Sequence, residues 1–429
     1  MRGKTASTGE YSPPSSGGGP PRFWKGIFAA ALLVLLALAL AACADDEDNG
    51  GIDEETATSV ILLIGDGMGV SHRAAARLYS GEELIMDGLP VAGVAKTGSA
   101  DKAVTDSAAA ATALATGVKT LNGALAVDPN GEPLTTLLEM AQAAGKKTGL
   151  VTDERLVDAT PAGFACHNAD RNDYLNIAVD ILNRDVDVLL GGGEDYFLPA
   201  GNTGCFPDDG DRTDGENLIE QAEAKGYEHV CSGAQLAALD LDAVEKLLGT
   251  FGDYEMERPY SPSLADMTSA ALAVLGRAPD GFFLMVEGGM IDDAGHRNDA
   301  VNALGDVLAF DEAVRVALAF QAEHPDTLII VTADHATGGP TIEDIPQDGD
   351  CPDPSPDDPR ECKQALHEDG PFPSAGGDFW LDWASSFHTA EDVGVGAIGP
   401  RATELAGCYE NTRIFEVMRD ALGLSPPSE

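Results

Sequence analysis

The sequence SVILLIGDGMG at residues 59–69 is the strongest indication of the fold class. Its apolar run from Val60 to Ile64 has no polar interruption and is stopped by Gly65. A continuous apolar run of this length, bounded by a glycine, predicts a strand that is buried on both faces. Asp66 follows directly, so the strand would place a carboxylate at its end.

Similar apolar runs recur at residues 148–152, 186–190, 282–286 and 327–332. Helical patterns lie among them, at residues 107–116, 134–144, 174–183, 264–276 and 300–322. Alternating strands and helices predict an α/β fold, a three-layer α/β/α sandwich whose central, mostly parallel sheet has helices on both faces. No repeat or Ser/Gly-rich linker follows Ser59, so we expect one domain over residues 59–425. Residues 343–379 are rich in Pro, Asp and Gly, and we expect a surface loop there.

The N-terminus has the pattern of a targeting segment. Basic residues precede an apolar run at residues 27–42, which ends in Leu40-Ala41-Ala42-Cys43. This run resembles the bacterial lipoprotein signal, so we expect a signal peptide at residues 1–42 and lipid attachment at Cys43. Export and anchoring to a membrane, facing the periplasm or the exterior, would follow. Residues 43–58 are expected to form a flexible acidic tether. An uncleaved anchor or an ordinary secretory signal is the alternative.

The charge is strongly negative. The chain has 72 Asp and Glu against 26 Lys and Arg, a formal net charge of -46. Such a surface repels polyanions, which argues against nucleic acid as a binding partner. Adaptation to a saline habitat is one explanation of this acidity, and simple solubility is the alternative.

The cysteines suggest disulfide bonds. Six remain besides Cys43, namely Cys166, Cys205, Cys231, Cys351, Cys362 and Cys408. An even number in an exported protein predicts pairing, and we expect a Cys351–Cys362 bond across the acidic loop. No CxxC motif occurs, which argues against a thiolate metal site.

Metal-ligand residue types follow three of the predicted strands. Asp66 follows the first, EGGMIDDAGH at residues 287–296 follows the fourth, and ADH at residues 333–335 follows the fifth. Because parallel strands end at one edge of the sheet, we expect these side chains to lie together. Asp and His suit zinc, and carboxylates suit magnesium. Asp292 and His296 are four residues apart, so one helical turn could direct both at one ion. Taken singly, each Asp could instead be a cap and each His an ordinary polar residue.

The segment TDSAAAATA at residues 105–113 predicts a helix that begins near Asp106 and Ser107. Helix N-termini bind anions, and a serine hydroxyl beside a metal ion can act as a nucleophile. A capping serine on an Ala-rich helix is the alternative.

Six stretches of the chain resemble the alkaline phosphatases. They are ILLIGDGMG, TDSAAAATA, DATPAGFACHNADR, VEGGMIDDAGH, TADH and FHTAEDVGV, which occur in the order of that family between Ile61 and Val395. The resemblance implies hydrolysis of small-molecule phosphate monoesters through a phosphoserine at Ser107, with Arg171 holding two phosphate oxygens.

The resemblance also implies two zinc ions and one magnesium ion. The residues implied for the first zinc are Asp292, His296 and His388. Those for the second zinc are Asp66, Asp334 and His335. Those for the magnesium are Asp66, Thr160 and Glu287.

Two features depart from the relatives. Asp293 stands where relatives often carry Lys, His or Trp, and an acid there should weaken phosphate binding. Only about fifty residues separate His335 from His388. This leaves little room for the large insert of the animal enzymes, so dimer contacts through such an insert are not expected, although a homodimer stays open.

Two other functions remain as alternatives. One is a phosphodiesterase or phosphonate hydrolase of the same superfamily, and the other is an inactive lipoprotein that binds metal or phosphate. Ser107 together with Arg171 favours monoester hydrolysis.

Overall fold

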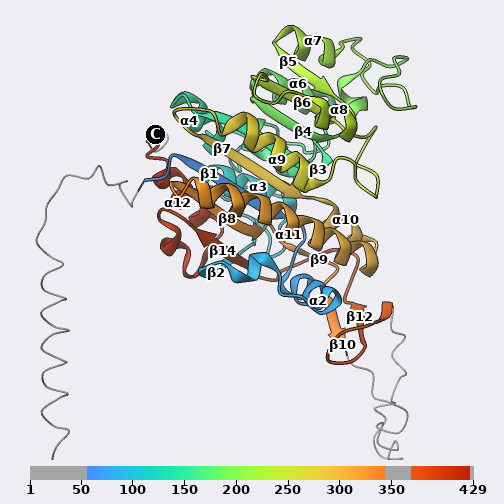
Figure 1. The fold of residues 1–429 in the computed structure, drawn as a ribbon, viewed down its shortest axis with the longest axis vertical. Coiled ribbons are helices and arrows are strands. Elements are labelled where there is room, and N and C mark those ends of the chain that lie inside the picture. The colour runs from blue at the N-terminus through green and yellow to red at the C-terminus, as the bar shows by residue number, and fades with distance from the viewer. Residues whose placement is uncertain (1–55, 344–368, 426–429) are drawn as a thin grey trace, which may run out of the picture. The chain divides into compact units, whose positions relative to one another are not determined.

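A ten-stranded sheet forms the centre of the computed structural model, which is described here over residues 56–343 and 369–425 (Figure 1). The strand order is β15-β2-β14-β8-β1-β7-β3-β4-β6-β5. The inner strands are β1 (Ser59–Gly65), β3 (Lys147–Arg155), β4 (Val188–Gly192), β7 (Phe282–Gly288) and β8 (Thr327–Ala333). The outer strands are β2 (Val91–Lys96), β5 (Tyr227–Val230), β6 (Lys246–Thr250), β14 (Val393–Ile398) and β15 (Gly407–Glu410).

Most neighbouring strands are parallel. β1 pairs in parallel with β7 and β8, and β3 with β7 and β4. β14 runs antiparallel to both of its neighbours, β8 and β2. Every residue of β1, β7 and β8 is buried, as expected for strands covered on both faces.

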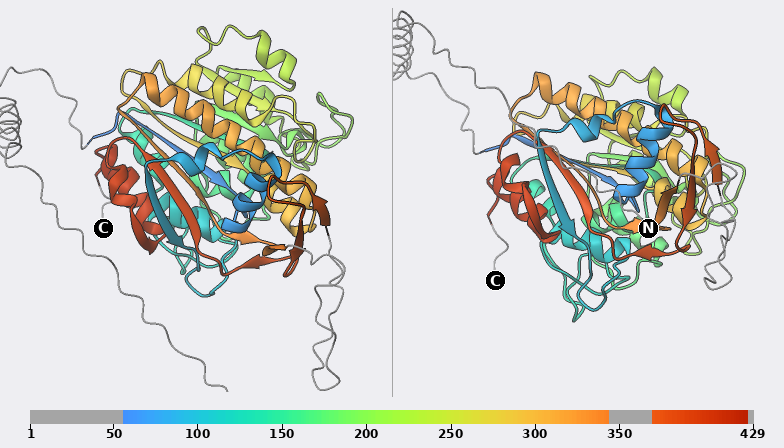
Figure 2. Two further views of the ribbon diagram at one scale, coloured as in Figure 1. Left: turned by 60° about the horizontal axis from the view of Figure 1, so that its bottom comes forward. Right: turned by 90° about the horizontal axis from the view of Figure 1, so that it is seen from below.

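Helices cover both faces of this sheet. On one face α9 (Leu264–Leu275) packs against α11 (Ala300–Glu323), and both cross the strands in the foreground of Figure 1. The other face is covered by α3 (Ser107–Thr116), α4 (Leu137–Ala143), α5 (Ala159–Ala165) and α12 (Thr412–Ala421). Figure 2 shows the sheet between these two sets of helices. The predicted three-layer α/β/α sandwich is confirmed.

The remaining elements are short or peripheral. The helices are α2 (Val70–Ser80), α6 (Tyr174–Asn183), α7 (Leu218–Ala224), α8 (Gly233–Ala238) and α10 (Met290–His296). The 3-10 turns are η1 (Ile85–Gly88), η2 (Glu194–Phe197) and η3 (Ala402–Leu405). A two-stranded sheet joins β9 (Ala336–Thr337) to β13 (His388–Thr389). All described residues belong to one compact unit, Ile52–Glu429.

The predicted elements agree closely with the observed ones. The helices expected at residues 107–116 and 174–183 have those bounds. The helix expected from residue 134 begins later, at Leu137. Its start is fixed by a capping box, in which Thr136 accepts the N–H of Glu139 and Glu139 accepts the N–H of Thr136.

The prediction of a surface loop at residues 343–379 is wrong for the C-terminal part of that range. β11 (Asp369–Phe372) and β12 (Phe379–Trp383) form a three-stranded sheet with β10 (Pro340–Glu343). Phe372 and Phe379 are buried, with ring centroids 5.4 Å apart, and this apolar contact outweighs the Pro and Gly composition.

The cysteine expectation is also partly wrong. Cys205 and Cys231 form a disulfide, but Cys166 is a buried free thiol and Cys408 an exposed one. Cys166 lies in the core, where its sulfur contacts the Ile177 carbonyl. Cys351, Cys362, Cys43 and the expected signal peptide lie outside the described residues. Within the described ranges, no helix combines the length and apolar character needed to cross a membrane.

Candidate active site

The ends of β1, β7 and β8 bring four acidic and basic side chains together. Asp66 follows β1, Glu287 lies near the end of β7, and Asp334 and His335 follow β8. The strand register pairs Gly65 with both Gly288 and Ala333, so Asp66 and Asp334 follow their strands at the same level, and Glu287 lies just before that level on β7. All four are buried.

Asp66, Asp334 and His335 form the first cluster that could hold a metal ion. One atom of each lies within 4.8 Å of the others. His335 Nε2 is 3.1 Å from Asp334 Oδ2 and 3.5 Å from Asp66 Oδ1. Both of these carboxylate oxygens are buried and lack a hydrogen-bond partner, which is costly unless a cation binds them. Burial and the charge of Asp292 raise the pKa of Asp334 to about 7, another sign of uncompensated negative charge.

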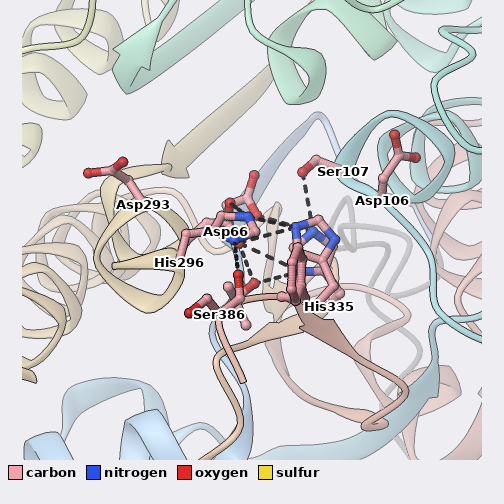
Figure 3. A network of polar contacts seen from close by, with 12 residues as sticks. Asp66, Asp106, Ser107, Asp293, His296, His335 and Ser386 are labelled. Atoms are coloured by element: carbon pink, nitrogen blue, oxygen red, sulfur yellow. Dashed lines mark hydrogen bonds and ion pairs between the residues drawn. The ribbon is translucent and has the colours of Figure 1, made fainter. Parts of the chain in front are cut away.

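The second cluster joins Asp292 to imidazoles. Single donor atoms of Asp292, His335 and His388 lie within 4.8 Å of one another. His296 Nε2 lies 3.2 Å from Asp292 Oδ2 and 3.1 Å from His388 Nε2, so it faces the same point (Figure 3).

The two outer histidines are oriented by backbone carbonyls. His296 Nδ1 is 2.8 Å from the Ser386 carbonyl, and His388 Nδ1 is 3.0 Å from the Thr105 carbonyl. These bonds direct both Nε2 atoms inward, which is the usual arrangement around a metal ion. The donor set therefore fits zinc.

Asp66, Thr160 and Glu287 are also neighbours. Thr160 Oγ1 is 3.4 Å from Asp66 Oδ2 and also contacts the Glu287 carboxylate, whose Oε2 accepts from Thr152 over 2.6 Å. Burial raises the pKa of Glu287 to about 8. An oxygen-only set of this kind fits magnesium.

Ser107 is the first residue of α3 and is only 2 % exposed. The capping residue of this helix is Asp106, whose side chain accepts the Ala109 N–H over 3.0 Å. The Ser107 hydroxyl is therefore not used as a cap, and its Oγ lies 3.2 Å from His335 Nε2 (Figure 3). The capping alternative for Ser107 is thus wrong.

Arg171 lies in the cleft next to Ser107. Its guanidinium donates to Asp158 Oδ1 over 3.0 Å and to Asp106 Oδ2 over 3.4 Å. The cleft has a volume of about 370 Å³, and its walls include Ser107, Arg171, Asp292 and His296. An anion that enters it meets a guanidinium and the N-terminus of α3.

Comparison with known proteins agrees with this geometry. A family model described as alkaline phosphatase matches residues 57–356. The chain belongs to the alkaline phosphatase family. Alkaline phosphatase of Escherichia coli (strain K12) is 35% identical, over 86% of each chain. Streptomycin-6-phosphate phosphatase of Streptomyces griseus is 36% identical, over 86% of this chain and 91% of its own. The crystal structure of Thermus thermophilus alkaline phosphatase is 29% identical, with a TM-score of 0.74, and the match covers 89% of this chain and 96% of that one.

Membership of the alkaline phosphatases establishes the reaction class. The chain is a metal-dependent hydrolase of small-molecule phosphate monoesters and uses divalent metal ions. The named relatives are phosphatases, which disfavours both the phosphodiesterase and the inactive-lipoprotein alternatives.

This alkaline phosphatase site includes two residues, Gly67 and Thr337, for which the sequence analysis predicted no role. Thr337 Oγ1 contacts Asp292 Oδ1 and lies 3.3 Å from His335 Nδ1, so one hydroxyl touches both metal-binding clusters. Gly67 has a φ of +68°, and a side chain there would collide with Asp292 and Thr337. The GDG motif suggests the role of Gly67, whereas no local pattern indicates Thr337.

The Asp293 carboxylate is directed toward the phosphate-binding part of the cleft less than its position next to Asp292 suggests. It lines the cleft, but its carboxylate points away from Ser107 and His335 (Figure 3). Asp293 Oδ1 accepts from Arg297 over 2.9 Å. The ion pair offsets part of the negative charge that we expected to weaken phosphate binding.

Proposed function

We propose that the chain hydrolyses phosphate monoesters by nucleophilic attack of Ser107 on phosphorus. The observation that carries this proposal is the position of the Ser107 hydroxyl, which lies at the N-terminus of α3, is not used as a cap and contacts His335 Nε2 over 3.2 Å. The Ser107 oxygen forms a bond to phosphorus while the bond to the alcohol oxygen breaks, and the serine proton leaves overall with the alcohol. Water then hydrolyses the phosphoserine and restores the serine hydroxyl.

We assign the metal ions by the fit of the donor atoms. Asp292, His296 and His388 would hold one zinc ion, and Asp66, Asp334 and His335 the other. Asp66, Thr160 and Glu287 would hold the magnesium ion. When bound, these ions stabilise negative charge on the attacking, leaving and phosphoryl oxygens. The two unpartnered buried carboxylate oxygens, Asp66 Oδ1 and Asp334 Oδ2, support this assignment.

Arg171 sets the preference for monoesters. Its planar fork can donate to two non-bridging oxygens at once, which suits the dianionic end of a monoester better than a diester. Asp158 and Asp106 hold the guanidinium in place before substrate binds. This reduces the entropy that Arg171 loses on binding.

The N-terminal sequence supports a location outside the cytoplasm. We propose a signal peptide at residues 1–42, lipid attachment at Cys43, a tether at residues 43–58 and the catalytic domain at residues 59–425. The Cys205–Cys231 disulfide also favours an oxidising compartment. Incorporation of labelled palmitate into the wild-type chain, and not into Cys43→Ser, would be the expected result.

Three measurements on purified protein test the active-site proposal. Ser107→Ala should lower turnover of p-nitrophenyl phosphate by at least about 10³-fold and leave the metal content unchanged. Ser374→Ala, in the connection between β11 and β12, is the matched control and should retain full activity. Acid-quenched wild-type enzyme should carry phosphate on Ser107 in a mass spectrum.

Two further results decide between the alternatives. Faster turnover of bis-p-nitrophenyl phosphate than of the monoester would contradict the monoester assignment. Metal analysis should find two zinc ions and one magnesium ion per chain, and His388→Ala should lose one zinc ion.

A further inference from the structure

The carboxyl end of β3 contacts the segment that joins β7 to α10. Thr152 binds Glu287, and the next residue, Asp153, is 1 % exposed. Asp153 Oδ1 accepts two backbone N–H groups, from Gly289 over 2.7 Å and from Met290 over 3.2 Å. Asp153 therefore caps α10 from a neighbouring strand, a task that the capping residue Gly289 cannot perform because it has no side chain.

The helix that Asp153 caps is short. α10 spans seven residues, Met290–His296, and so few residues do not form a stable helix on their own. Its position must come from tertiary contacts. It carries Asp292 and His296, both assigned above to one zinc ion.

Met290 is held from a second side. Arg258 Nη2 donates to the Met290 carbonyl over 3.2 Å, and the same guanidinium is paired with Asp306 on α11. Tyr260 donates to Asp306 Oδ1 over 2.8 Å and completes this arrangement. The first turn of α10 is thus fixed at its N–H groups by Asp153 and at a carbonyl by Arg258.

We propose that Asp153 is a positioning residue for the zinc-binding turn. By fixing the start of α10, it sets the direction in which Asp292 and His296 point, and hence the affinity of the site for zinc. The proposal rests on the zinc assignment made under the proposed function. Removal of a group that orients metal ligands typically weakens metal binding by about 10- to 100-fold.

Asparagine is the informative replacement. Its side-chain oxygen can still accept both N–H groups. Its amide NH2 group takes the place of Asp153 Oδ2, which has no hydrogen-bond partner. Burial and the nearby charge of Asp306 raise the pKa of Asp153 to about 7, so an uncharged side chain is tolerated there near neutral pH.

Asp311 provides a matched control. It is also buried, at 5 % exposed, and also accepts two backbone N–H groups, from Ile85 over 2.8 Å and Met86 over 2.9 Å. These bonds fix η1, which carries none of the assigned metal ligands. Asp311→Ala should therefore cost a similar amount of stability without affecting zinc.

The experiment measures the zinc dissociation constant of the full chain by competition with a chromophoric chelator, together with the melting temperature. Asp153→Ala should bind zinc about 10- to 100-fold more weakly than wild type. Asp153→Asn and Asp311→Ala should stay within about threefold. If Asp153→Ala yields no folded protein, Asp153→Ser, with its shorter acceptor, should still weaken zinc binding by more than about threefold.

Two results would overturn the positioning role: unchanged zinc affinity in the folded Asp153→Ala or Asp153→Ser variant, or an equal loss in Asp311→Ala. His296→Ala tests the underlying zinc assignment separately. If His296→Ala binds zinc as tightly as wild type, the ligand set is wrong, whatever the Asp153 variants show.

Discussion

Replacing Arg171 with alanine removes the guanidinium that we propose holds the phosphoryl group. Two hydrogen bonds to an anion are lost, each contributing about 1.5–3 kcal/mol. Arg171 is 23% exposed, so the lower end of this range applies, about 3 kcal/mol in total for the transition state. This corresponds to a loss of roughly 10²-fold in kcat/KM.

The fold should survive this substitution. Asp158, the main partner of Arg171, still accepts from Arg155 Nη2 over 2.6 Å and from the Ala159 N–H over 2.6 Å. No charge would be left buried and unpaired, so the melting temperature should change little.

The assay is kcat/KM for p-nitrophenyl phosphate, with the inhibition constant for inorganic phosphate measured alongside. Arg171→Lys keeps the charge but not the fork and should lose about tenfold. Arg315→Ala removes an exposed arginine paired with Glu312 on α11 and controls for net charge. A change of less than about threefold in Arg171→Ala, or an equal loss in Arg315→Ala, would refute the reasoning.

Three other predictions follow from the described contacts. Asp293→Lys replaces an acid at the cleft wall and should tighten inhibition by inorganic phosphate about fivefold; an unchanged inhibition constant would show that Arg297 already neutralises Asp293. The hydrogen bond to Glu139 raises the pKa of His167. The ion pair should therefore stabilise the fold below the unfolded pKa of about 6.5, and this stabilisation should be lost as the pH rises through the folded pKa of His167. Denaturant unfolding of His167→Gln and wild type at several pH values checks whether the difference in free energy of unfolding shrinks as the pH rises. Replacing Cys205 and Cys231 with serine removes a disulfide between cysteines with a sequence separation of 26. The free energy of unfolding in urea should fall by about 3 kcal/mol. An unaltered unfolding midpoint would argue against the pairing.

The core and most of the chemically important residues could be predicted from the sequence. A strand buried on both faces is typically rich in apolar residues along its whole length, so β1, β3, β7 and β8 could be predicted from their apolar runs. Asp66, Glu287, Asp334 and His335 lie at or directly after such runs, and the parallel topology places them at one edge. These inferences depend on residues that are close in the chain.

The outer strands were missed because their patterns are weak. β2 (VAGVAK) and β14 (VGVGAI) both contain glycine. β2 alternates mainly between partly buried and exposed positions, β14 has only buried and partly buried ones, and β15 is mostly exposed. Residues 369–379 were predicted as part of a loop, and only the packing of Phe372 against Phe379 shows that strands begin there. In both cases, the stabilising contacts are tertiary and depend on strands that pair across a sheet.

The packing of distant segments completes the site. His388 reaches the cluster because β13 pairs with β9, which aligns His388 with Thr337. The Ser107 hydroxyl faces His335 and is not used as a cap because Asp106 takes that role, and Asp153 reaches Gly289 across 136 positions of sequence. The contacts that His388, Ser107 and Asp153 make with Thr337, His335 and Gly289 each join residues that are far apart in the chain, so no local pattern encodes them. The SVILLIGDGMG motif at residues 59–69 thus specifies a buried strand followed by a carboxylate, and the packing of distant segments around that carboxylate makes it part of an active site.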